Sequence, residues 1–309
     1  MDVLRLDLGS RPGRLGRAVA TIGNFDGLHV GHRKIIGEAV AAAARRGERS
    51  VVVTFDPHPV KVLHPEAGFR CLKTLDQRLH DLAGMGVGAV AIVRFDRTLS
   101  RATPRAFVEC ILARALAVSE VLIGRSFRFG RGRAGDVALL RALGRELGFT
   151  TRAVRPVTRG GRPVSSSRIR TALFAGDVSE AARLLGARFR VEGTIVRGAG
   201  RGTRSVFPTA NLQSANECLP APGVYATRAE LGGRTYAAAS FLGQPATFGE
   251  RRSVFESHLL DFDGGDLYGE DLAVEFVRRL RGQVKFPSAA ALKAQIAHDL
   301  DRARKIARL

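Results

Sequence analysis

The feature that most constrains the fold is a change of hydrophobic pattern partway along the chain. Up to about residue 175, short apolar runs alternate with helical segments. The runs that read as buried strands lie at 18–23, 49–55, 88–95, 119–124 and 150–157. Such alternation is typical of a doubly wound parallel sheet with helices on both faces. The first part of the chain is therefore predicted to be an α/β domain.

The second part loses the helical periodicity between residues 188 and 280. Strand-like segments, separated by turns rich in Gly, Pro and Asp, lie at 189–197, 223–231, 234–242, 253–262 and 272–280. This spacing predicts a small antiparallel β-barrel, and the pattern over 288–309 predicts a final helix. A length of 309 residues is enough for two cores. We expect two domains, 1–186 and 187–309.

Hydropathy and cysteine usage set the compartment that we expect. No apolar run approaches the roughly 18–20 residues that a membrane span needs. Residues 1–17 lack the apolar region of a secretory signal. The three cysteines are widely spaced and do not fit a disulfide framework. The sequence predicts a cytoplasmic chain without a membrane partner, and it allows a homo-oligomer.

The net charge of +20 raises the question of a nucleic-acid partner, because dense Lys and Arg bind phosphate backbones. The basic residues are almost all Arg and are scattered along the chain. They form no block and do not alternate with aromatic residues as in single-strand binders. This distribution argues against a nucleic-acid partner and suits an anionic nucleotide ligand.

A ten-residue loop, GNFDGLHVGH at 23–32, carries the strongest chemical signal. It lies between the first predicted strand and a helical segment that Gly47 closes. The free N–H groups and positive dipole of a helix start attract a polyanion, and glycines let phosphate oxygens approach the backbone. One histidine would merely cap such a helix, whereas two histidines with three glycines favour phosphate binding. The candidate nucleotide-binding residues are Gly23, Asn24, Phe25, Asp26, Gly27, His29, Gly31 and His32.

Three further polar clusters follow predicted strands of the first domain. They are TFDPHP at 54–59, IGRSFRFGRGRAGD at 123–136 and VSSSRIR at 164–170. Ligands of doubly wound sheets bind beyond the carboxyl ends of the strands. Taken singly, each cluster is also compatible with a Pro-rich turn or an ordinary helix cap. Together with the 23–32 loop they indicate one crevice.

These four motifs resemble the N-terminal half of prokaryotic bifunctional riboflavin kinase/FAD synthetases, and the second half carries that family's other motifs in order. They are GAGRG at 198–202, FPTANL at 207–212, PAPGVY at 220–225, FESHLLDF at 255–262, LYG at 267–269 and LRGQVKF at 280–286. The resemblance covers nearly the whole chain. It implies a Rossmann-like nucleotidyltransferase domain followed by a riboflavin kinase barrel with a C-terminal helix.

In the first half, the resemblance implies transfer of an adenylyl group from ATP to FMN, with release of pyrophosphate. His29 and His32 would bind the ATP phosphates, and Ser166, Ser167 and Arg170 would hold the triphosphate. The residues implied in flavin binding are Asp56, Pro57, His58, Ser126, Phe127, Arg128 and Phe129.

In the second half, the resemblance implies phosphorylation of riboflavin by ATP. Strand alternation places Glu256, His258 and Leu260 on one face, and Glu256 matches the family's general base. The residues implied in binding Mg²⁺ are Thr209 and Asn211, and those implied in a flap over ATP are Gly198, Gly200 and Gly202.

Riboflavin, FMN and ATP are therefore the expected substrates, and Mg²⁺ is the expected cofactor. Two alternatives stay open: a nucleotidyltransferase whose barrel only binds ligands, and a flavin- or RNA-binding regulator without catalysis. The chain departs from the family's usual pattern at Ser126, Val206, Phe241 and Gln283. Most of these departures fall in the second half.

Overall fold

The computed structural model describes residues 1–11, 16–197, 209–243, 254–265 and 267–308. The chain folds as two compact units, Met1–Ser165 and Ser166–Leu309. Each unit is described by itself.

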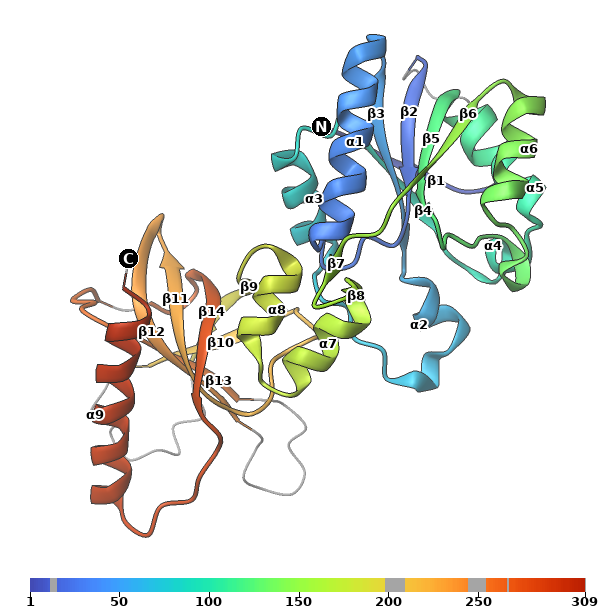
Figure 1. Cartoon of the computed structure of the whole chain (residues 1–309). Helices are drawn as coiled ribbons and strands as arrows, with labels where there is room; N and C mark the ends of the chain where they lie inside the picture. The colour runs from blue at the N-terminus through green and yellow to red at the C-terminus, as the bar shows by residue number, and fades with distance from the viewer. Residues whose placement is uncertain (12–15, 198–208, 244–253, 266, 309) are drawn as a thin grey trace. The chain divides into compact units, whose positions relative to one another are not determined.

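The first unit contains one six-stranded parallel sheet (Figure 1). The strand order is β1-β4-β3-β2-β5-β6, and each neighbouring pair is parallel. The strands are β1 (Asp2–Leu6), β2 (Ala18–Ile22), β3 (Arg49–Asp56), β4 (Ala89–Arg94), β5 (Val118–Gly124) and β6 (Thr150–Val154). The predicted doubly wound sheet is confirmed. The edge strand β1 was not predicted, because its exposed and polar residues give no buried-strand pattern.

Helices cover both faces of this sheet because its central strands are apolar on both sides. The helices α1 (Val30–Arg46) and α3 (Leu75–Gly84) pack on one face. The other face carries α5 (Pro104–Phe107), the π-helical segment Val108–Ala115 that continues it, and α6 (Val137–Leu147) (Figure 1). The shorter elements are α2 (Pro59–Leu63), the 3₁₀ turns Pro65–Ala67 and Arg131–Arg133, α4 (Arg97–Arg101), and the hairpin of β7 (Thr158–Arg159) and β8 (Arg162–Pro163).

The predicted helix signals act as expected in this unit. Gly47 ends α1 in the left-handed conformation with φ 64°, which glycine adopts without steric cost. The hydroxyl of Thr103 accepts the N–H of Ala106 and caps α5, and Pro104 is its first helical residue.

The second unit contains a closed six-stranded antiparallel barrel of order β10-β13-β12-β11-β14-β9. The strands are β9 (Phe189–Val196), β10 (Ala210–Ser214), β11 (Gly223–Leu231), β12 (Arg234–Gly243), β13 (Val254–Leu259) and β14 (Asp271–Arg281). Large aromatic side chains fill its core, with Tyr225, Phe189 and Phe255 each against Phe276. The predicted barrel is confirmed, and β10 is an additional strand that the polar sequence ANLQS did not indicate.

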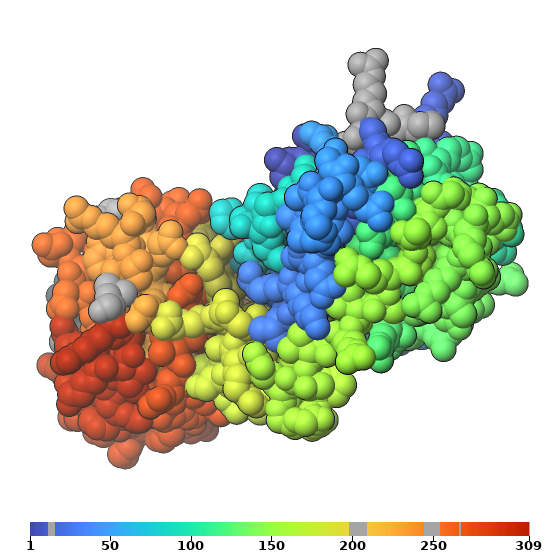
Figure 2. Space-filling view, turned by 45° about the horizontal axis from the view of Figure 1, so that its top comes forward, coloured from blue at the N-terminus to red at the C-terminus, as the bar shows by residue number. Residues whose placement is uncertain are grey.

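The described residues of the second unit form three helices. The helices α7 (Ser166–Phe174) and α8 (Val178–Leu185) are joined by Gly176, as predicted, and α8 packs against β9 and β14. The helix α9 (Ala289–Ile306) lies along β11, β12 and β14, and its atoms form one side of this unit's surface (Figure 2). Within the described ranges, no helix combines the length and the apolar character needed to cross a membrane.

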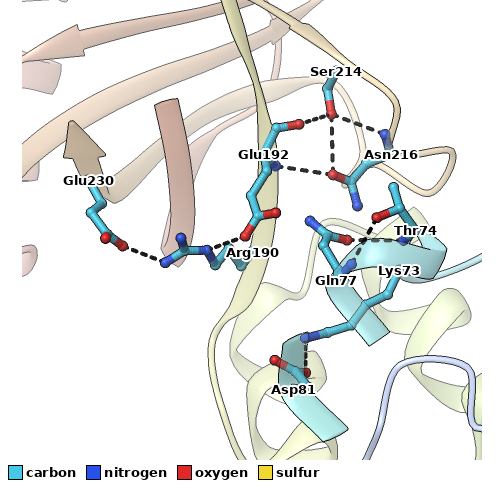
Figure 3. Close-up of polar contacts among 9 residues, drawn as sticks. All are labelled: Lys73, Thr74, Gln77, Asp81, Arg190, Glu192, Ser214, Asn216 and Glu230. Carbon is cyan, nitrogen blue, oxygen red and sulfur yellow. Dashed lines mark hydrogen bonds and ion pairs between the residues drawn. The ribbon is translucent and has the colours of Figure 1, made fainter. Parts of the chain in front are cut away.

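The barrel begins with a close approach of two strands. Gly193 on β9 pairs with Ser214 on β10, and a Cβ at Gly193 would overlap the carbonyl oxygen of Gln213. The pair is also tied by polar contacts, because the N–H of Glu192 donates to Asn216 Oδ1 at 3.1 Å and Ser214 Oγ donates to the Glu192 carbonyl (Figure 3). Only glycine fits at this crossing.

We therefore expect Gly193→Ala to destabilise the barrel by about 1–3 kcal/mol, as overpacking does. Urea denaturation of the full chain, followed through an inserted fluorophore in the second unit, measures this. Gly265→Ala is the matched control, because a Cβ there meets open space. Equal urea midpoints for Gly193→Ala and Gly265→Ala would show that β9 and β10 can move apart to admit the Cβ without loss of stability.

Candidate functional site

The 23–32 loop lies where the order of the parallel sheet reverses. The strand β2 pairs with β3 on one side and β5 on the other, and the connections that leave its two neighbours turn to opposite faces. Such a switch point opens a crevice at the carboxyl ends of the strands. The motif 54–59 begins at the end of β3, and residues 126–129 follow β5. The sheet thus brings three of the four predicted motifs to one edge.

The backbone of this loop is strained and tightly held. Phe25 and Leu28 have φ of 47° and 46°, and Gly27 between them has φ of 84°. A side chain in this region costs of order 1–3 kcal/mol, and such strain clusters at functional sites. Phe25 and Leu28 are both buried in the apolar core beneath α1. Burial of these two side chains therefore offsets the strain and fixes the course of the loop.

The two histidines stack at the start of α1. His29 is the N-cap residue, and its Nδ1 accepts the backbone N–H of His32 at 3.2 Å. The rings are parallel within 17° at a centroid distance of 3.6 Å, and Phe25 contacts His32 edge-on. A Cβ at Gly31 would lie 3.1 Å from Cε1 of His29. Glycine at this position therefore leaves room for the His29 ring.

Both imidazoles are neutral at pH 7. Burial lowers the pKa of His29 to about 4, and burial together with the nearby His29 lowers the pKa of His32 well below its ordinary value. Since Nδ1 of neutral His29 is an acceptor, the proton is on Nε2, which becomes a donor. The loop therefore offers neutral ring donors beside the positive end of a helix dipole, which suits a polyanion.

Asp26 and Asn24 are also held by hydrogen bonds from residues outside the loop. Asp26 is buried, and its Oδ1 accepts the N–H groups of Leu72 at 2.9 Å and Lys73 at 3.4 Å. The carbonyl oxygen of Asn24 accepts from Thr54 Oγ1 and from Arg78 Nη1. Sequence reasoning missed Arg78, because an arginine inside a helical pattern looks like a solvated surface residue.

The residues implied in flavin binding differ in burial. Asp56 ends β3, and His58 caps α2 through Nδ1 and stacks on Phe69 at 4.2 Å. Phe129 is buried in the core, so its ring supports the loop. The other residues are Pro57 beside Asp56, exposed Ser126, Phe127 stacked on Phe129, and Arg128 paired with Asp136 at 3.1 Å.

Ser166, Ser167 and Arg170 lie in the first turns of α7, which belongs to the second compact unit. Ser167 is exposed, and Ser166 and Arg170 are partly buried. The first N–H groups of an α-helix make no hydrogen bond within the helix, and the two serine hydroxyls lie at this end of α7.

In the barrel, the register brings Glu256 and Asn211 together. Asn211 on β10 is the direct partner of Glu256 on β13, and Phe241 on β12 is its partner on the other side. Directly opposed residues point to the same face of a sheet. Thr209 immediately precedes β10. The carboxylate and the two predicted metal-binding residues therefore lie at one place.

Glu256 lines a cavity of about 400 Å³ between the barrel and α9. Apolar side chains from the barrel, from the 282–286 segment and from α9 form most of its walls. The lining residues that matter here are Thr209, Phe241, Glu256, His258, Gln283, Phe286, Leu292 and Ile296. Its volume lies within the usual range of small-molecule pockets, about 300–1,000 Å³.

The predicted strand alternation is confirmed at β13. Glu256 and His258 face the cavity, whereas Ser257 is buried inside the barrel and bonds Ser240 at 2.9 Å. Burial raises the pKa of the Glu256 carboxyl. A carboxylate that holds a proton more readily than usual is suited to accept one from a substrate.

A buried ion pair fixes one wall of this cavity. Arg281 at the end of β14 donates through Nε to Asp299 on α9 at 2.8 Å, and Gln295 donates to the same carboxylate at 2.9 Å. The Arg281 guanidinium also lies over the ring of Phe286 at 5.4 Å. These contacts hold α9 and the 282–286 segment together around the cavity.

The implied flap residues Gly198, Gly200 and Gly202, and the departure Val206, lie outside the described residues. Within the described part of the chain, no group of three or more His, Cys, Asp or Glu forms a metal cluster. Thr209 and Asn211 nevertheless supply the hard oxygen donors that suit Mg²⁺, which also takes ligands from phosphates and water.

Comparisons with known proteins match each half separately. A family model described as FAD synthetase matches residues 12–168, and one described as riboflavin kinase matches residues 185–307. A bifunctional riboflavin kinase/FMN adenylyltransferase from Pseudomonas fluorescens is 37% identical over 96% of this chain and 95% of its own. The enzyme of that name from Escherichia coli K12 is 36% identical over 93% of this chain and 92% of its own.

A solved structure shares the whole architecture. It is described as a macrolide-efflux protein from Streptococcus pneumoniae, and it superposes with a TM-score of 0.90 at 28% identity, covering 98% of this chain and 99% of its own. The two consecutive family matches and the near full-length relatives show that this chain belongs to the family of bifunctional riboflavin kinase/FMN adenylyltransferases.

Proposed function

We propose that the chain makes FMN and then FAD in two ATP-dependent reactions. In the first, the 5′-hydroxyl oxygen of riboflavin attacks the γ-phosphorus of ATP, ADP leaves, and FMN forms. In the second, a phosphate oxygen of FMN attacks the α-phosphorus of another ATP, and pyrophosphate leaves. The riboflavin kinase match at 185–307 supports the first reaction in the second half of the chain, and the FAD synthetase match at 12–168 supports the second reaction in the first half. Neither alternative considered from the sequence is favoured.

The stacked pair of neutral histidines carries the assignment of adenylyl transfer. The attacking phosphate oxygen is already anionic, so this reaction needs no protein base. Positioning and stabilisation of the transferred charge are what remain for the protein. We assign this work to His29, His32 and the backbone of residues 23–31, with Ser166, Ser167 and Arg170 holding the triphosphate.

Glu256 carries the assignment of riboflavin phosphorylation. The hydroxyl of riboflavin has a high pKa, and a positioned carboxylate that takes its proton assists the attack. The raised pKa of Glu256 supports this role. We place the flavin ring in the adjoining cavity, against Phe241 and Phe286. Phe241 and Gln283, where the chain departs from the family's usual pattern, both line that cavity. We therefore expect these two departures to change the contacts with the flavin.

Mg²⁺ bound with ATP would supply charge neutralisation at the transferred phosphoryl group. Thr209 and Asn211 would hold it, because they combine hard oxygen donors with proximity to Glu256. The glycines at 198, 200 and 202 are proposed to cover the ATP phosphates. In the first half, we propose that Asp56, Pro57, His58 and residues 126–129 contact the flavin.

We propose that the functional boundary falls at 186/187, after α8 and close to residue 185, where the riboflavin kinase match begins. The compact units divide earlier, after Ser165, because α8 buries Val178, Ala181 and Leu184 and packs against the barrel. The helices α7 and α8 thus support the barrel physically, whereas Ser166, Ser167 and Arg170 are assigned to adenylyl transfer.

Replacing His29 or His32 by alanine tests the first assignment. Loss of one preorganised donor should lower FAD formation from FMN and ATP by roughly 10²–10³-fold. Riboflavin phosphorylation by the same sample should be unchanged and serves as the control. Chromatographic separation of riboflavin, FMN and FAD measures both activities. FAD formation at the wild-type rate would exclude the phosphate role of the substituted histidine.

The variant Glu256→Gln tests the second assignment. It keeps the shape of the side chain but removes the base, so riboflavin phosphorylation should fall by about 10²–10⁴-fold. FAD formation from added FMN should continue at the wild-type rate.

The pH dependence gives a second measurement on Glu256. The active carboxylate form is lost as the pH falls through the carboxyl pKa, and this pKa is raised by burial. Wild-type phosphorylation should therefore decline on the acid side at a higher pH than an ordinary glutamate would produce. A Glu256→Gln variant with the same acid limb, or with full activity, would show that Glu256 is only structural.

Two fragments test the boundary. We expect both 166–309 and 187–309 to phosphorylate riboflavin, because Glu256, Asn211 and the cavity belong to both. The shorter fragment should unfold at a lower temperature, since it lacks the apolar surface that α8 buries. Thermal unfolding and a riboflavin kinase assay measure these properties. A folded 187–309 fragment without kinase activity would move the boundary toward residue 166.

A further inference from the structure

Arg78 on α3 joins the 23–32 loop to the end of β3. Its Nη1 donates to the carbonyl oxygen of Asn24 at 3.1 Å and to Thr54 Oγ1 at 3.2 Å. Thr54 Oγ1 in turn donates to the same carbonyl oxygen at 3.2 Å. The three groups form a closed triangle, and Arg78 and Thr54 are only 6% and 1% exposed.

The charge of Arg78 is poorly balanced for its burial. Among the described residues, its carboxylate contact is Asp56 Oδ1, at 3.9 Å from Nη2, beyond hydrogen-bond distance. Its Nε is buried and has no hydrogen-bond partner among the described residues. A buried charge of this kind costs free energy, and an apolar side chain of similar volume often serves stability as well or better. Stability alone therefore does not explain an arginine here.

The helix that carries Arg78 is itself fixed to the loop. At its start, Thr74 and Gln77 form a reciprocal capping box, and Lys73 pairs with Asp81 (Figure 3). The N–H groups just before this cap bind the Asp26 carboxylate. The loop is thus held to the α3 segment at two points, through the side chain of Asp26 and through the carbonyl of Asn24.

The anchored carbonyl lies next to the strained part of the loop. Asn24 immediately precedes Phe25, which is the first residue of the loop with positive φ. His29 lies four residues after Phe25. A strained segment persists only when its surroundings hold it. Release of the Asn24 carbonyl would let the backbone relax, and the histidine pair would move with it.

We propose that Arg78 is a positioning residue for adenylyl transfer. It holds the histidine loop against the end of β3, so that the ATP-binding residues and the 54–59 motif keep one fixed separation. This inference rests on the proposed function of the first unit. Nη1 makes both hydrogen bonds while Nη2 is directed to Asp56, and a planar guanidinium reaches these separate groups better than the single ammonium of lysine does.

The test compares Arg78→Met, Arg78→Lys and Thr54→Val in the full chain. Arg152→Met is the matched control, because Arg152 is also in the first unit and pairs with Glu38 and Glu120, away from the loop. Three measurements are made on each variant. They are kcat and KM of FAD formation from FMN and ATP, amide hydrogen exchange of peptides from the 23–32 loop without ligand, and riboflavin phosphorylation.

Arg78→Met should lower kcat/KM of FAD formation by about 10- to 100-fold, the size of effect that a displaced reacting group produces. Exchange in the 23–32 peptides should accelerate, and the barrel peptides and riboflavin phosphorylation should not change. Arg78→Lys should recover part of the rate, and Thr54→Val should show the same effects in weaker form. Arg152→Met should leave the loop peptides and the rate as in the wild type.

Two results would overturn the proposal. One is an Arg78→Met variant whose loop exchange and FAD-forming kinetics equal those of the wild type. The other is an Arg152→Met variant whose exchange accelerates and whose kcat/KM falls as much as in Arg78→Met. If Arg78→Met does not fold, Arg78→Lys and Thr54→Val decide the question by the same readouts. If the wild-type chain forms no FAD, the proposed function of the first unit fails. The exchange data then still decide whether Arg78 holds the loop.

Discussion

The parallel pairing of β2 with both β3 and β5 is the constraint on which the first unit depends. It places the order reversal of the sheet next to β2, so the loop that leaves β2 enters the crevice and not a helix-covered face. The burial of Phe25 and Leu28 and the contacts of Asn24 with Thr54 and Arg78 depend on that placement.

Burial shifts the pKa values at the two sites in opposite directions. It favours the neutral form of every group, so it lowers the pKa of a histidine and raises the pKa of a glutamate. It lowers the pKa values of His29 and His32 and keeps both rings uncharged, which suits the role proposed for them beside the negatively charged phosphates of ATP. It raises the pKa of Glu256 and makes that carboxylate a better proton acceptor. The difference matches the two reactions, since only the attack by a hydroxyl group requires a base.

Much of this organisation was predictable because it depends on local signals. Alternating apolar segments indicated the parallel sheet, Gly47 and Thr103 marked helix ends, and strand alternation gave the face of Glu256. Other features carry no local signal. The strand β10 is too polar to be recognised, and it forms because β9 and β13 supply hydrogen-bond partners. The helices α7 and α8 join the barrel unit through side-chain packing that spacing cannot reveal.

The sequence by itself determined the two architectures, the motifs and their order, since periodicity and turn chemistry are properties of neighbouring residues. The tertiary structure alone decided which distant groups meet. It set Asn211 opposite Glu256, enclosed the cavity under α9, and buried Arg78 against the Asn24 carbonyl. The physical reason is that register, burial and the pKa shifts they cause arise from contacts between segments far apart in the chain.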